Sequence, residues 1–214
     1  MKNLTRTICL TLAVLLGSTG TSWGADYETG LAAAQSGDFA TALQEWEPVA
    51  KQGDARAQYG LGFMYGKGDG VPQDYKTAVK WFTLAAKQGN ADAQYELGQM
   101  HLNGQGVPQD YTTAVKWFSL AAEQGLPVAQ NTLAIMYNEG LGIPQDYKTA
   151  VKWFTLAAEQ GDATAQYNLG LMYHKGEGVP QNDKTAVKWW TLSAEQVSVD
   201  AQFNLGVMYR DGEG

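Results

Sequence analysis

The chain contains 214 residues, with 15 basic and 22 acidic side chains and a formal net charge of −7 at neutral pH. Nucleic acids and anionic membrane surfaces are bound through clustered Lys and Arg, so this balance argues against both as partners. A single cysteine, Cys9, leaves no second thiol for a disulfide or a cysteine metal site within the chain.

The first 24 residues have the pattern of a secretory signal peptide. Lys2 and Arg6 precede an apolar run at 8–16, which is about half of the ~20 residues that span a bilayer, and small residues follow it. We expect cleavage after Gly24, which would remove Cys9 and leave the mature chain without a thiol. An uncleaved membrane anchor is the alternative. The predicted protein is therefore exported, to the periplasm or out of the cell.

The rest of the chain repeats with a period of 36 residues. A fixed period of about 20 to 50 residues indicates one supersecondary unit stacked on copies of itself. The tryptophans of the repeated phrase DYKTAVKWFTLAA mark the register at Trp81, Trp117, Trp153 and Trp189. The chain then divides into a signal peptide at 1–24, a tetratricopeptide-like capping repeat at 25–56, repeats at 57–92, 93–128, 129–164 and 165–200, and a truncated repeat at 201–214.

The capping repeat departs from the later ones. Its first helix is expected at 27–35, and the short link Ser-Gly-Asp replaces the glycine loop of the other repeats. Terminal repeats of a solenoid are often variant because one of their faces meets solvent, so this unit suits an N-terminal cap. Its second helix carries the apolar positions of the repeat as Phe39, Ala42, Trp46 and Ala50.

Each later repeat is predicted to open with an amphipathic helix, called helix A. In the first copy, Ala57, Leu61 and Met64 lie on one face at helical spacing within a segment at 57–65. The same three side chains return in every later unit. A methionine stripe can act as a pliable binding surface or as soft metal ligands, but its place beside Leu61 and the equivalent leucines of helix A predicts core packing.

A glycine-rich loop at 68–74 leads into the second helix, called helix B. Two glycines and a proline disfavour helix there, and the loop lacks the spacing of phosphate-binding loops, so it is predicted to be a turn. Asp74 should accept hydrogen bonds from the first amides of a helix at 75–88, and Gly89 should end that helix.

Helix B is apolar over most of its circumference, which predicts packing against its own helix A and against the next repeat. We interpret the tryptophan row as core between repeats rather than as a stacking platform. Lys80 and its equivalents are interpreted as a solvated strip rather than as a basic binding ridge. The predicted apolar face of the first copy consists of Tyr75, Ala78, Val79, Phe82, Ala85 and Ala86, with Trp81 and Leu84 at its flank.

The repeat resembles two related families. Leu61-Gly62-x-x-Tyr65 followed by Ala78-x-x-x-Phe82 matches the core of the tetratricopeptide pattern. The glycine loop, the N-cap aspartate and the Trp-Phe pair of helix B look like the Sel-1-like repeat, a tetratricopeptide relative with longer units. The resemblance implies an all-α fold, a right-handed α/α superhelical solenoid of antiparallel helix pairs. It also implies an adaptor or interaction platform, a role frequent among exported bacterial proteins.

Four positions depart from the repeat. The tyrosine of helix A becomes His101 in the second repeat, and its glycine becomes Ala134 in the third. In the fourth repeat the first residue of helix B becomes Asp183, and the glycine after that helix becomes Val197. The segment 183–200 is therefore the one whose packing is least well predicted.

The sequence contains no recognised catalytic constellation. His101 and His174 fall in different rows and different repeats, and no S-x-x-K, G-x-S-x-G or H-E-x-x-H motif occurs. Some cysteine-rich members of the resembled family have been described as β-lactamases, but their paired cysteines are absent here. A pair of hydrolytic carboxylates stays open. We predict no enzyme, no cofactor and no metal, with an envelope hydrolase of the β-lactamase-like or glycan-cleaving kind as the alternative.

The copies differ most on helix A, at positions spaced i, i+4 and i+7, which form a stripe beside the packed face. By resemblance to tetratricopeptide arrays, helix A lines the concave groove, so this stripe is the candidate surface for a peptide or partner protein. The alternative is that these are partly exposed packing positions that drift between copies. The candidate residues are Tyr59, Phe63, Tyr95, Gln99, Leu102, Asn131, Ile135, Asn138, Tyr167, Leu171 and His174.

The predicted function is a non-catalytic protein–protein interaction scaffold in the cell envelope or outside the cell, with no membrane insertion after signal cleavage. The sixth helix A, at 201–209, is not followed by a helix B within the sequence. We expect its apolar face to be covered either by a partner or by further residues of a longer protein, of which this chain would then be a structural segment.

Overall fold

The computed structural model describes residues 26–211, and the predicted signal peptide with its cleavage site lies outside this range. Eleven α-helices and no strands make up the regular structure of the described residues. The capping pair is α2 (Tyr27–Gln35) and α3 (Phe39–Lys51). The helices that follow are α4 (Ala55–Lys67), α5 (Tyr75–Lys87), α6 (Ala91–Asn103), α7 (Tyr111–Glu123), α8 (Pro127–Glu139), α9 (Tyr147–Glu159), α10 (Ala163–Lys175), α11 (Asp183–Glu195) and α12 (Val199–Asp211).

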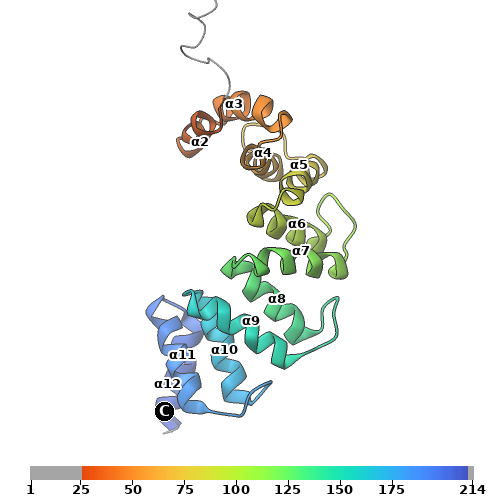
Figure 1. The fold of residues 1–214 in the computed structure, drawn as a ribbon. Coiled ribbons are helices and arrows are strands. Elements are labelled where there is room, and N and C mark those ends of the chain that lie inside the picture. Colours follow the sequence, from red (N-terminus) through yellow and green to blue (C-terminus); the bar gives the residue numbers. More distant parts are fainter. Residues whose placement is uncertain (1–25, 212–214) are drawn as a thin grey trace, which may run out of the picture.

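The helices stack in chain order into a curved solenoid (Figure 1). Extensive contacts among the described helices join only elements that are neighbours in the sequence. The predicted all-α solenoid of antiparallel helix pairs is confirmed. Because each repeat touches only the repeats beside it, any binding surface must extend along the stack. Within residues 26–211, none of the helices has the length and apolar character needed to cross a membrane.

Side-chain caps and left-handed residues fix where the helices begin and end. The Asp74 carboxylate accepts a hydrogen bond from the backbone N–H of Lys76 at 2.9 Å, so helix B begins where the sequence predicts. Gly89 follows helix B with a φ of +90°, as expected of a residue that ends a helix. Helix A begins two residues earlier than predicted, at Ala55, because Asp54 caps it in the same way.

The alanine, leucine and methionine rows of helix A form the centre of the stack, as predicted. Leu61 and Met64 are buried in a cluster that joins α3 to α4, and Trp81 packs against this cluster. Trp117 packs in the same way against the cluster that joins α5 to α6. Each tryptophan therefore covers a junction between repeats, which confirms its interpretation as core between repeats.

One part of the predicted apolar face is wrong. Leu84 is 45% exposed, although the sequence placed it at the flank of the packed stripe. Its equivalents on the following B helices are equally exposed, so the B helices carry a regular row of half-exposed leucines. This leucine row consists of Leu84, Leu120, Leu156 and Leu192.

A buried glutamine row, which the sequence reading did not single out, links consecutive repeats. Gln58 on α4 donates from Nε2 to the carbonyl oxygen of Ala50 on α3 at 2.9 Å. Its Oε1 accepts from Nε2 of Gln88, at the end of α5, at 2.8 Å. A buried polar group left without its partner costs about 1–3 kcal/mol, so this row favours a single register of the stack. The same pair of bonds recurs at Gln94, Gln130 and Gln166.

The departures of the fourth repeat are accommodated locally. Asp183 Oδ1 lies 2.8 Å from His174 Nδ1 on α10, so the changed first residue of helix B pairs with a residue of the preceding helix A. Val197 takes the left-handed conformation of the glycines at this position, with a φ of +67°. A β-branched side chain is strained in this region.

Val197→Gly is therefore expected to raise the free energy of unfolding by about 1 kcal/mol. Relief of the left-handed strain is worth about 1–2 kcal/mol, and the greater freedom of glycine in the unfolded chain offsets about 0.5–1 kcal/mol of it. Urea denaturation followed by circular dichroism measures the change. Val199→Gly is the matched control, because Val199 is equally exposed, at 73% against 77%, but begins a helix. A loss of stability in both variants would contradict the inference that Val197 is strained.

Candidate functional site

Three hollows open along the A helices, each where one A helix meets the next. The first lies between α2 and α4 and has a volume of about 440 Å³. The second lies between α4 and α6, with about 220 Å³, and the third between α8 and α10, with about 270 Å³. We name them the α2–α4, α4–α6 and α8–α10 hollows.

The α2–α4 hollow is largely apolar. Its walls come from both helices of the capping repeat and from α4, and Asp69 contributes the single carboxylate. Its volume falls within the range of about 300–1,000 Å³ that is typical of ligand pockets, and so does its lining of aromatic and aliphatic side chains. The lining residues are Tyr27, Leu31, Ala34, Gln35, Phe39, Trp46, Tyr59, Gly60, Phe63, Met64 and Asp69.

The α4–α6 hollow is polar and carries opposite charges on its two A helices, Lys67 on α4 and Glu96 on α6. Burial raises the pKa of the Glu96 carboxyl, and the nearby Lys67 ammonium opposes this effect only in part. The remaining lining residues are Phe63, Gly66, Gln73, Tyr75, Phe82, Gln99, Met100 and Gln105.

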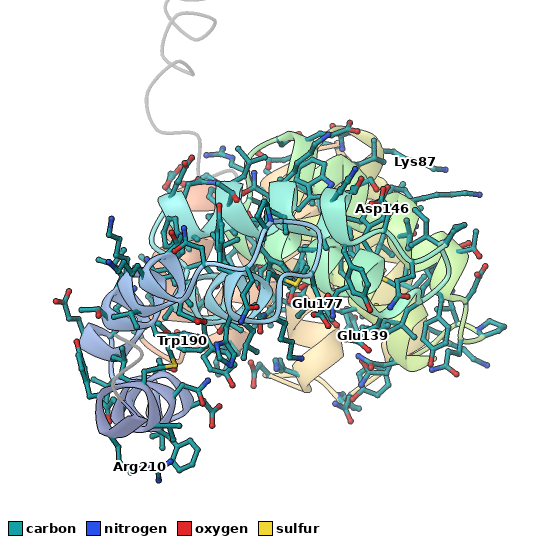
Figure 2. All side chains as sticks on the ribbon, turned by 90° about the horizontal axis from the view of Figure 1, so that it is seen from below. Lys87, Glu139, Asp146, Glu177, Trp190 and Arg210 are labelled. Carbon is teal, nitrogen blue, oxygen red and sulfur yellow. The ribbon has the colours of Figure 1, made fainter. Side chains whose placement is uncertain are left out.

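The α8–α10 hollow occupies the same place two repeats further along the chain. Asn138 stands where the α4–α6 hollow has Gly66, and Asn168 stands where it has Glu96. The Asn138 Oδ1 atom is buried and accepts no hydrogen bond from the described residues, whereas its Nδ2 donates to Glu139. Glu139 and Glu177, two other lining residues, project from α8 and from the loop after α10 (Figure 2).

One position of helix A differs in side-chain volume between the first two repeats. In the second repeat this position holds Leu102, which packs against the core cluster formed by α7 and α8. In the first repeat it holds Gly66, and a Cβ atom there would meet only the Ala78 Cβ, at an ordinary 3.7 Å. Gly66 therefore leaves open the space that Leu102 occupies one repeat later.

Six of the eleven candidate residues line a hollow. Phe63 is shared by the α2–α4 and α4–α6 hollows, and at 40% exposure it is the most open large apolar side chain of the set. The other five lining candidates are distributed over all three hollows. The candidate stripe therefore coincides with the hollows over part of its length. The six residues are Tyr59, Phe63, Gln99, Ile135, Asn138 and Leu171.

The other five candidates make internal contacts. The Tyr95 ring packs on Phe118 with ring centroids 5.5 Å apart, and Leu102 packs on the core. Asn131 is buried and accepts from Asn168. The remaining two are Tyr167, which packs on the cluster that contains Trp190, and His174, which pairs with Asp183.

The charged residues of the α4–α6 hollow and the walls supplied by the capping repeat are not among the residues that the sequence predicts for the site. A signal for Glu96 was present, since its row reads Gly60, Glu96, Thr132 and Asn168 and so varies as much as the rows that were chosen. The capping walls gave no such signal, because a unit that occurs once cannot be compared with copies of itself. Within residues 26–211 no cluster of His, Cys, Asp and Glu is placed to hold a metal ion.

Comparison with known families gives one consistent result. Five segments match the Sel1 repeat, at residues 55–90, 91–126, 127–162, 163–198 and 199–214. Residues 27–65 match a tetratricopeptide repeat. No protein of curated function matched the chain.

Solved structures with this architecture include two that are more than 30% identical. One is c5321, described as a protective antigen present in uropathogenic Escherichia coli strains and displaying an SLR fold, with a TM-score of 0.78 and 44% identity over 79% of this chain. This chain covers only 36% of c5321. A Sel1 repeat protein from Oxalobacter formigenes gives a TM-score of 0.82 and 33% identity, covering 86% of this chain and 76% of its own.

A third structure shares the fold alone. Helicobacter pylori cysteine rich protein B superposes with a TM-score of 0.50 at 22% identity, over 62% of this chain and 96% of its own length. Its cysteine-rich character has no counterpart in this sequence, which contains one cysteine.

Proposed function

This chain belongs to the Sel1 repeat family, and we propose that it is an exported, non-catalytic scaffold that binds a peptide or partner protein along its A helices. Sel1 and tetratricopeptide repeats typically form protein–protein interaction scaffolds. The observation that carries the proposal is the placement of three hollows on one row of helices, lined by side chains that differ from repeat to repeat. A partner that extends along the stack would meet a different surface in each repeat.

The chemistry of the α2–α4 and α4–α6 hollows supports binding rather than a reaction. Lys67 and Glu96 are the charged groups of the α4–α6 hollow, and the α2–α4 hollow is almost wholly apolar with one carboxylate. Apolar walls with a few fixed polar groups are what recognition of a side chain requires.

Replacing three lining residues together, as Phe63→Ala, Ile135→Ala and Leu171→Ala, is expected to lower capture of partner proteins about tenfold or more. Truncation of apolar anchors removes most of the binding energy of an interface. The purified arrays, immobilised at equal density, are exposed to the exported fraction of the source cells, and the retained proteins are quantified by mass spectrometry. Circular dichroism shows whether each variant is folded.

The matched control truncates three apolar side chains on the other row of helices, as Leu84→Ala, Leu120→Ala and Leu156→Ala. These leucines are half exposed, lie on the B helices and line none of the three hollows. Capture should survive in this control. Equal capture by the helix A variant and the native array would contradict the proposed function. A loss of capture confined to the control would place the binding surface on the leucine row of the B helices instead.

The proposed export rests on the signal pattern in the first 24 residues. N-terminal sequencing of the protein recovered from the periplasm or the culture medium should begin at Ala25. An intact N-terminus on protein that stays with the membrane fraction would instead favour the uncleaved anchor.

A further inference from the structure

We propose that the α2–α4 and α4–α6 hollows form one continuous site for a peptide segment that carries a large apolar side chain beside a basic one. The apolar side chain enters the α2–α4 hollow, and the basic side chain pairs with Glu96 in the α4–α6 hollow. This inference rests on the proposed function and names the chemistry of the partner at its N-terminal end.

The two hollows adjoin each other across α4. Phe63 lines both of them, so the apolar wall of the first continues into the second. Tyr59, which lines the α2–α4 hollow, has its pKa raised to about 12 by burial and by the charges of Glu96 and Asp92 on α6. The carboxylates of α6 therefore lie close enough to act on the apolar hollow, and one short segment can reach both.

The apolar half selects a large side chain. Aromatic rings surround it, with Tyr27 and Trp46 stacked at 6.0 Å between ring centroids and Tyr59 on the facing helix. A volume of about 440 Å³ leaves room for an aromatic or long aliphatic group together with part of its backbone. Release of water from such walls lowers the free energy of the system, so an apolar side chain is the favoured occupant.

The acidic half selects a cation. Glu96 is half-buried, and none of the ion pairs among the described residues involves it. Lys67, the cation facing it, instead lies over the Phe63 ring, with Nζ 5.6 Å from the ring centroid. A Lys or Arg side chain of a partner would give this desolvated carboxylate a close counter-charge. The net charge of −7 favours the approach of the same cationic partner.

A random dodecapeptide library displayed on phage, selected on the immobilised native array, tests this chemistry. Enriched peptides are expected to contain a Trp, Phe, Leu or Met within a few residues of an Arg or Lys. The most enriched peptide is then synthesised with a fluorescent label, and its dissociation constant is measured by fluorescence anisotropy.

A double-mutant cycle locates the basic side chain. Glu96→Gln keeps the size of the side chain and should weaken the peptide about tenfold, whereas it should leave the affinity of a peptide with Arg→Ala unchanged. A separate variant, Gly66→Leu, copies the residue of the next repeat and should weaken both peptides by filling the α4–α6 hollow. Glu123→Gln is the control, since Glu123 is an exposed carboxylate on α7 outside the hollows.

The outcomes separate this inference from the proposed function. Enriched peptides without a basic residue, or equal affinity of the native array and Glu96→Gln, would overturn the inference and leave the scaffold function standing. Failure of the library to yield any binding peptide, together with normal capture of proteins on the A helices, would do the same. If the native array bound no library peptide and captured no protein, the proposed function would be overturned as well.

Discussion

Phe118→Ala is expected to lower the free energy of unfolding by about 3–5 kcal/mol, the usual cost of removing a buried aromatic ring from a core. Phe118 is 0% exposed and lies in the cluster that joins α7 to α8. Tyr95 packs on its ring, and Gly98 lies so close to it that a Cβ atom there would come within 2.5 Å of Cε1. Gly98 has no side chain that could fill the cavity left by the ring.

Equilibrium urea denaturation, followed by circular dichroism and by tryptophan fluorescence, measures this change. Leu120→Ala is the control, because Leu120 lies two residues further along the same helix and is 44% exposed. Its expected cost is within about 1 kcal/mol. Equal losses in the two variants would show that the buried ring does not carry the stability assigned to it.

The period of the sequence predicts the architecture because each copy independently repeats the same physical requirements. Asp74 caps helix B and Gly89 ends it in the structure as in the sequence, since both act through their own backbone neighbourhood. The tryptophan row was correctly interpreted as core between repeats for a related reason. Each tryptophan packs against the core cluster of the helices that precede its own helix B.

The hollows could not be predicted because they depend on contacts between different repeats. Gly66 and Leu102 occupy the same row, and only the structure shows that one opens a space that the other fills. Tyr95 is a residue that variation between copies wrongly indicated as part of the binding surface, because its ring packs on Phe118. Variation between copies therefore identifies the helices that line the hollows, whereas contacts across the junction determine which of their residues do so.

The leucine row shows a third limit of the sequence. Helical spacing places Leu84 next to the packed face, yet the angular width of that face depends on how closely the next repeat approaches. The structure leaves the leucines of all four B helices half exposed. Periodicity gives the direction of a side chain from the helix axis, and the neighbouring helix determines its burial.

Gly106→Ala should have an effect as large as the loss of the buried ring, for a different reason. Gly106 lies in the loop between α6 and α7 with a φ of +72°, a conformation that costs a residue with a Cβ atom about 1–2 kcal/mol. A Cβ atom there would also lie 2.5 Å from the backbone C and O atoms of Tyr75, the first residue of α5. The neighbour is backbone, which cannot rotate away, so we expect a total loss of about 3 kcal/mol or more.

The contact joins two repeats, so Gly106→Ala should also weaken the coupling between them. The loop of one repeat rests on the start of helix B in the repeat before it, and the same approach recurs at Gly142 over Tyr111 and at Gly178 over Tyr147. In a linear array, stability is the sum of repeat and interface contributions, and loss of one interface allows the two sides to unfold separately. Urea denaturation should then show a broadened or biphasic transition.

Gly125→Ala separates the two causes, because Gly125 has a φ of +90° but nothing within 4 Å of the position of an added Cβ atom. It should lose only the conformational part, about 1–2 kcal/mol, and keep a single transition. Hydrogen exchange of α5 relative to α9 provides the second readout, since amides at the start of α5 should lose protection in Gly106→Ala alone. Equal losses and equal protection in the two variants would mean that backbone conformation, and not the contact between repeats, makes glycine necessary in this loop.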